Sequence, residues 1–209
     1  MQPLLFNNLH IENEPVNIPL PDGITLTIKR EDKNHPFVSG NKLRKLKYNI
    51  TQAQQEGKDT ILTFGGAYSN HIAATAAAGQ IVGLKTIGVI RGDELGSKID
   101  VNPTLKFAKS CGMDFYFVTR EAYRRKHTPE FLENLRKRYG QNIYIAPEGG
   151  TNELAVKGCE EILTPEDNAF DVICSAVGTG GTISGLINAS ANHQKVIGFP
   201  ALRGAIRRR

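Results

Sequence analysis

The stretch Asp171-Val172-Ile173-Cys174-Ser175-Ala176-Val177-Gly178-Thr179-Gly180-Gly181-Thr182 joins a short apolar run to a glycine-rich loop. Continuous apolar runs rich in β-branched residues are typical of strands that are covered on both faces. A helix pattern follows over 183–191, so the glycines let the backbone curl and the helix N-terminus directs free N–H groups at an anion. The stretch therefore predicts a strand, a phosphate-binding turn and a helix. The alternative is a merely tight strand-to-helix connection.

The same loop does not match two well-defined nucleotide-binding motifs. No Gly-Lys-Ser/Thr follows Gly181, as a Walker A loop requires, and the third glycine of G-x-G-x-x-G would fall at Ile183. A nucleotide-binding α/β module is an alternative that rests on the glycine loop alone.

Similar apolar runs alternate with helix patterns along most of the chain. The runs predict strands at 60–64, 85–90, 114–118, 142–146 and 195–199, and the helix patterns lie at 70–78, 102–110, 128 onward, 152–163 and 183–191. An earlier segment, 24–30, alternates apolar and polar residues as a half-exposed strand does. This alternation predicts an α/β fold with mostly parallel strands.

Composition excludes several classes of protein. Of 209 residues, 40% are apolar and 22% charged, and no run is long and apolar enough to predict a membrane-spanning helix or a secretory signal. Three cysteines without a CxxC pair argue against disulfides and a zinc site, so we expect no metal and a reducing, cytoplasmic compartment. The arginines at 203, 207, 208 and 209 carry most of the net charge of +5, and tryptophan is absent, so we expect no nucleic-acid partner.

Two further motifs place reactive side chains near helix starts. In Gly65-Gly66-Ala67-Tyr68-Ser69-Asn70-His71, amides at the helix start can hold a carboxylate. The equal alternative is a simple N-cap by Ser69 or Asn70, and a lone histidine such as His71 is more often packed or solvated. In Ser39-Gly40-Asn41-Lys42-Leu43-Arg44-Lys45-Leu46, we expect Lys45, like Lys47 beyond it, to be solvated. Lys42 begins the helix, where a cation is disfavoured, and a neutral amine there suits Schiff-base chemistry.

Together with Ile145-Ala146-Pro147-Glu148-Gly149-Gly150-Thr151-Asn152, these motifs resemble those of pyridoxal-phosphate enzymes of the tryptophan-synthase-β-like fold. Within that fold the chain is similar to the 1-aminocyclopropane-1-carboxylate deaminase/D-cysteine desulfhydrase group. The resemblance implies two open, twisted, mostly parallel sheets flanked by helices. It also implies pyridoxal 5'-phosphate as cofactor, a small amino acid as substrate and a homodimer.

The resemblance also implies roles for residues. Lys42 would hold the cofactor covalently, and Asn70 would hydrogen-bond its phenolic oxygen. Ser69 would receive the substrate carboxylate or assist proton transfer, with Asn70 and His71 also binding substrate. The phosphate would be bound by the glycine loop, that is by Gly178, Thr179, Gly180, Gly181 and Thr182.

The implied layout is a larger cofactor domain, 1–49 plus 148–209, with a smaller α/β domain, 50–147, inserted into it. The implied reaction is deamination or β-elimination that gives a 2-oxo acid and ammonia. Members of the group are longer, however, and no tyrosine follows Tyr144. We therefore expect a chain truncated at its carboxyl end, with exposed apolar edge strands and little turnover. The alternative function is a non-catalytic, cofactor-binding fragment.

Overall fold

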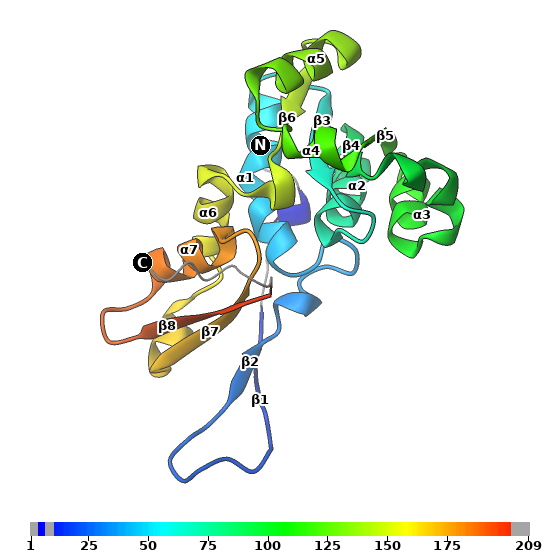
Figure 1. Cartoon of the computed structure of the whole chain (residues 1–209). Helices are drawn as coiled ribbons and strands as arrows, with labels where there is room; N and C mark the ends of the chain where they lie inside the picture. The colour runs from blue at the N-terminus through cyan, green and yellow to red at the C-terminus, as the bar shows by residue number, and fades with distance from the viewer. Residues whose placement is uncertain (1–3, 7–10, 202–209) are drawn as a thin grey trace.

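The structure is a computed structural model that describes residues 4–6 and 11–201 (Figure 1). The arginine-rich tail from 203 onward lies outside the described residues. The chain is an α/β protein with parallel sheets and flanking helices, as its sequence predicts. Short 3-10 helices lie at Leu4–Phe6, Glu31–Lys33, Asp93–Val101, Glu148–Gly150 (η4) and Pro165–Ala169.

The larger sheet is four-stranded and parallel, in the order β5-β4-β3-β6. Its strands are β3 (Thr60–Gly65), β4 (Lys85–Arg91), β5 (Asp114–Val118) and β6 (Ile143–Ile145). Every residue of the central strand β3 is buried, with Ile61 packing among residues of one core cluster and Leu62 and Phe64 among those of another. The prediction of strands covered on both faces is therefore correct here.

The helices that join these strands begin where polar side chains cap them. They are α2 (Asn70–Val82), α3 (Pro103–Ser110), α4 (Arg120–Arg124) and α5 (Pro129–Tyr139). Ser69 caps α2 and Thr128 caps α5, each accepting a backbone N–H three residues on. Helix α2 runs four residues further than predicted because Gly83, with φ +74°, supplies the left-handed turn that ends it.

The second parallel sheet holds only β7 (Val172–Val177) and β8 (Lys195–Pro200) among the described residues. Helices α6 (Glu153–Glu160) and α7 (Gly181–Ala189) cover one of its faces, where Ile173 and Val196 pack. Burial alternates along β7, and Val172 is 47% exposed, so the prediction that this run is covered on both faces is wrong. Both strands of this sheet are edges among the described residues, and Val172 and Phe199 are exposed on them. A separate antiparallel pair joins β1 (Asn13–Pro15) to β2 (Thr27–Lys29).

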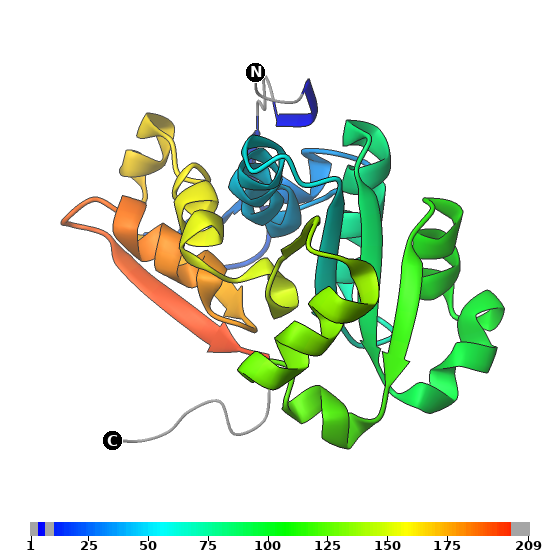
Figure 2. The same ribbon diagram turned by 90° about the horizontal axis from the view of Figure 1, so that it is seen from above.

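Helix α1 (Asn41–Gln55) lies between the two parallel sheets and packs against α6 and α2 (Figure 2). The four-stranded sheet uses only residues within 50–147, but the division into two domains stays a prediction. None of the helices in the described ranges is long and apolar enough to cross a membrane. Those ranges also contain no cluster of three or more metal-ligating side chains.

Candidate active site

The glycine loop between β7 and α7 leaves space for a ligand. No side chain caps α7, and its N-cap residue Gly180 has φ +90°. A Cβ on Gly178 or Gly180 would meet no atom within 4 Å, whereas one on Gly181 would lie 2.9 Å from Thr151 Cγ2. Helix α7 begins at Gly181, two residues earlier than predicted. The free N–H groups of its first turn therefore begin within the glycine loop. This geometry suits an anion.

A buried lysine lies beside this loop. Lys45 is 2% exposed, and its Nζ lies 3.0 Å from Thr151 Oγ1, 3.3 Å from Thr179 Oγ1 and 3.4 Å from the Gly149 carbonyl oxygen. None of the ion pairs formed by the described residues involves Lys45. The prediction that Lys45 is solvated is therefore wrong, because all four residues from Leu43 to Leu46 are buried where α1 packs between its neighbours.

The second lysine of this pair is Lys42, three residues earlier on α1. It is half-buried, and its side chain has no hydrogen-bond partner within the described ranges. Burial lowers its pKa, and burial together with repulsion from Lys42 lowers the pKa of Lys45 to about 8. Lys47 instead pairs with Glu161, with 2.5 Å between the charged atoms. The pair at 42 and 45 therefore holds amines that deprotonate more readily than ordinary lysines.

The turn before α2 presents Ser69 and Asn70. The backbone N–H of Ser69 donates to the Gly66 carbonyl over 3.1 Å, and its Oγ accepts from the Ile72 N–H over 3.3 Å. The Ser69 hydroxyl proton stays available to a ligand, and Asn70 is exposed. Ser69 rather than Asn70 is thus the N-cap, and this capping role is compatible with binding a carboxylate.

His71 does not face this opening. Its side chain is 1% exposed, and Nε2 lies 2.9 Å from Thr63 Oγ1. Because the Thr63 hydroxyl donates its proton to the Ala146 carbonyl over 3.0 Å, it accepts from His71, which places the imidazole proton on Nε2. Burial, with the charges of Lys42 and Lys45, lowers the pKa of His71 to about 3. The imidazole therefore packs inside the protein rather than lining the opening, and a contact between His71 and substrate stays a prediction.

The segment around η4 contacts both the start of α2 and the glycine loop. A Cβ on Gly150 would lie 2.8 Å from His71 Cε1, so the imidazole packs directly against this glycine. The neighbouring Thr151 hydroxyl lies 2.5 Å from that of Thr179. Asn41 at the start of α1 donates to Thr182 Oγ1 over 2.7 Å. Motifs far apart in sequence thus meet around Lys45, for which the sequence predicted a solvated side chain and no role in the site.

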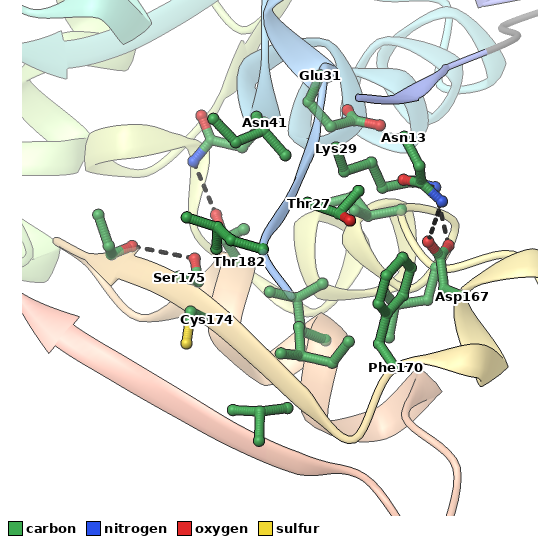
Figure 3. A pocket seen from close by; sticks show the side chains of 18 of the residues that line it. Asn13, Thr27, Lys29, Glu31, Asn41, Asp167, Phe170, Cys174, Ser175 and Thr182 are labelled. Carbon is green, nitrogen blue, oxygen red and sulfur yellow. Dashed lines mark hydrogen bonds and ion pairs between the residues drawn. The ribbon is translucent and has the colours of Figure 1, made fainter. Parts of the chain in front are cut away.

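A groove of about 540 Å³ lies beside this site, between β2 and β7 (Figure 3). The Asn41–Thr182 hydrogen bond lies at one end of it, and Asp167, which pairs with Lys29 over 2.8 Å, lies at the other. Residues 25–29, which include β2, line one side of it, and residues 172–176 of β7 line the other, over an apolar floor that includes Ile162 and Leu186. The groove is therefore a gap between two strand edges and does not include the lysine pair.

Comparisons with known proteins point to one family of enzymes. Residues 9–205 match the pyridoxal-phosphate dependent enzyme family. A putative 1-aminocyclopropane-1-carboxylate deaminase of Thermotoga maritima is 35% identical in an alignment that covers 84% of this chain and 58% of that protein. The bifunctional, mitochondrial D-cysteine desulfhydrase/1-aminocyclopropane-1-carboxylate deaminase of Arabidopsis thaliana is 34% identical, over 81% of this chain and 46% of that protein.

A solved structure, that of an ACC deaminase homologue, matches with a TM-score of 0.71 and 28% identity, covering 90% of this chain and 58% of that one. The chain thus spans about half the length of the curated relatives that it matches.

Proposed function

The chain belongs to the family of pyridoxal-phosphate dependent enzymes, and from this premise we propose that it acts on a small amino acid as a deaminase or desulfhydrase. Relatives carry the names of 1-aminocyclopropane-1-carboxylate deaminase, D-cysteine desulfhydrase, or both. The proposed products are a 2-oxo acid and ammonia, with sulfide as well when the substrate is D-cysteine.

The observation that supports this proposal is the buried ammonium of Lys45, which has hydroxyl and carbonyl partners but no carboxylate in the described part of the chain. A buried cation without a counter-ion is costly unless an anion joins it. The cofactor's phosphate fits here, held by Lys45, the Thr179 hydroxyl and the N–H groups that begin α7. The residues present therefore suit the cofactor of the family.

The other roles in binding the cofactor and the substrate are assigned to Lys42, Asn70 and Ser69. Lys42, half-buried and with its pKa lowered, attaches the cofactor and carries the proton to be moved. Asn70 donates to the cofactor's ring oxygen, and Ser69 donates to the substrate carboxylate. When bound, the cofactor supplies an electron sink for the bond that breaks. We further propose a cytoplasmic homodimer, since the three free cysteines suit a reducing compartment.

A second candidate is a cofactor-binding fragment without turnover. The contacts around Lys45 support binding of the cofactor's phosphate whether or not turnover follows, so they are compatible with this candidate as well.

Titration with pyridoxal 5'-phosphate, followed by visible absorption, tests the cofactor. Release of pyruvate and sulfide from D-cysteine, or of 2-oxobutanoate from 1-aminocyclopropane-1-carboxylate, then separates the two candidates. Absorption with turnover supports the enzyme, and absorption alone supports the fragment. No absorption change would overturn both.

A further inference from the structure

An arginine without an acidic partner lies beside the turn that presents Ser69. Arg91 is the last residue of β4, and its Nη2 lies 3.8 Å from the place that a Cβ on Gly66 would take. None of the ion pairs and side-chain hydrogen bonds formed by residues 4–6 and 11–201 involves the Arg91 side chain. Its charge is therefore available to a ligand at this turn.

The pairing of β3 with β4 places Arg91 beside Gly66. Strands β3 and β4 are parallel, with Gly65 opposite Ile90, so Arg91 and Gly66 are the next residues at the same edge. Gly92, with φ +113°, donates to the Val118 carbonyl over 2.8 Å and turns the chain away directly after Arg91. In parallel α/β sheets ligands bind at the carboxyl ends of the strands, which is where this guanidinium lies.

The carboxylates nearby already have cations of their own. Glu148 pairs with Lys126 over 3.2 Å and accepts the Tyr123 hydroxyl over 2.8 Å. Glu94, three residues after Arg91, pairs with Arg120 over 2.7 Å. The Tyr123 ring, whose centroid lies 5.9 Å from Arg91 Cζ, provides an aromatic face for the guanidinium but no counter-charge. Of Arg91, Arg120 and Lys126, Arg91 alone has no carboxylate partner among the described residues.

We propose that Arg91 determines substrate specificity by binding the α-carboxylate of the amino acid. This inference rests on the proposed function. The hydrogen bond from the Ser69 N–H to the Gly66 carbonyl keeps the two ends of the turn together, so a carboxylate that accepts from Ser69 lies within reach of Arg91. A guanidinium donates two parallel hydrogen bonds to a carboxylate, which neither the turn nor a lysine offers.

The test uses D-alanine and ethylamine, which differ only by the carboxylate, on protein loaded with pyridoxal 5'-phosphate. Dissociation constants come from the change in visible absorption. Arg91→Gln should weaken D-alanine binding about 10- to 100-fold and leave ethylamine unchanged, since a hydrogen bond to a charged group contributes that much to affinity. Arg124→Gln, which removes an exposed guanidinium and leaves Glu94 and Glu148 with their cations, is the matched control and should bind D-alanine as the unmodified chain does. Equal affinity in both variants, or an equal loss for ethylamine, would overturn the proposal.

A cofactor-free measurement separates this proposal from the proposed function. Acetate is titrated into the unloaded protein while the backbone amide signals of Gly66 and Ser69 are followed by NMR. These signals should shift in the unmodified chain and in Arg124→Gln, and should stay still in Arg91→Gln. Absence of any shift in the unmodified chain overturns the Arg91 proposal, whereas failure to bind the cofactor counts against the proposed function alone.

Discussion

The Nζ atom of Lys45 lies 3.3 Å from Oγ1 of Thr179, a residue 134 positions later in the chain. This contact joins the helix that carries the lysine pair to the glycine loop after β7. It gives the loop a cation that its own sequence lacks. The amine is nonetheless buried with no carboxylate among its described partners, so under the proposed function the cofactor's phosphate would be its counter-ion.

Lys45→Met should weaken binding of pyridoxal 5'-phosphate about 10- to 100-fold, because it removes a charge-assisted hydrogen bond to the phosphate. The free energy of unfolding of the cofactor-free protein should stay the same or rise, since a buried charge is replaced by an apolar chain of similar length. Cofactor titration and thermal unfolding measure the two effects. Lys47→Met is the control, because Lys47 pairs with Glu161 outside the loop and should leave cofactor affinity intact. Unchanged affinity in Lys45→Met would contradict the phosphate role.

Borohydride reduction of the cofactor-loaded protein should fix the pyridoxyl group on Lys42. Both amines have a lowered pKa, so reactivity alone does not choose between them. Geometry does, because the Lys45 amine is held by Thr151 and Thr179 at the phosphate end, whereas that of Lys42 has no partner in the described part of the chain. Peptide mapping by mass spectrometry locates the label. Lys42→Ala should lose the visible band, and a label on Lys45 or Lys47 would refute the assignment.

The sequence predicts those features of the structure that neighbouring residues determine, and it misses those that depend on contacts between distant elements. Strands β3, β4 and β5 follow from continuous apolar runs, and their predicted bounds are correct to within one residue. The burial of Lys45 is not local, because among the closely spaced lysines of α1 the one covered is chosen by how α6 and α2 pack. The same holds for His71, whose neighbours Thr63 and Gly150 lie on other elements. The groove beside β7 depends on strand pairing, which no run of residues encodes by itself.

Lysines on the open face of β7 should reduce self-association. Val172 and Ala176 are exposed on this face, next to a strand edge that lines the groove, and such edges pair with other chains. Val172→Lys with Ala176→Lys should lower the concentration-dependent increase in mass seen by analytical ultracentrifugation, with little change in unfolding free energy. Gln54→Lys with Gln55→Lys, on the exposed end of α1, adds the same charge elsewhere. An equal decrease in that control would show a general charge effect instead.

The stability of the protein should fall as pH drops below about 6.5, and His71 should account for part of this fall. Its native pKa of about 3 lies below its ordinary value of 6.5, because the buried imidazole resists a charge. Below pH 6.5 the unfolded chain therefore binds a proton that the native chain does not. The resulting loss is about 1.4 kcal/mol of unfolding free energy per pH unit, or about 2 kcal/mol between pH 6.5 and 5. Urea unfolding at a series of pH values measures it.

His71→Gln should remove that part of the slope, because its amide donates to Thr63 as the Nε2–H group does but takes up no proton. The window from pH 6.5 to 5 is chosen because the carboxylates whose native pKa is lowered, such as Asp167 and Glu14, lose their contribution at lower pH. The pKa of His35 is also lowered by burial, so a smaller slope of the same sign should persist in His71→Gln and disappear when His35→Gln is added. His127→Gln, at an exposed histidine, is the matched control and should keep the full slope. If His71→Gln and His127→Gln gave the same dependence on pH, the imidazole of His71 would not be the neutral, buried group that its contacts indicate.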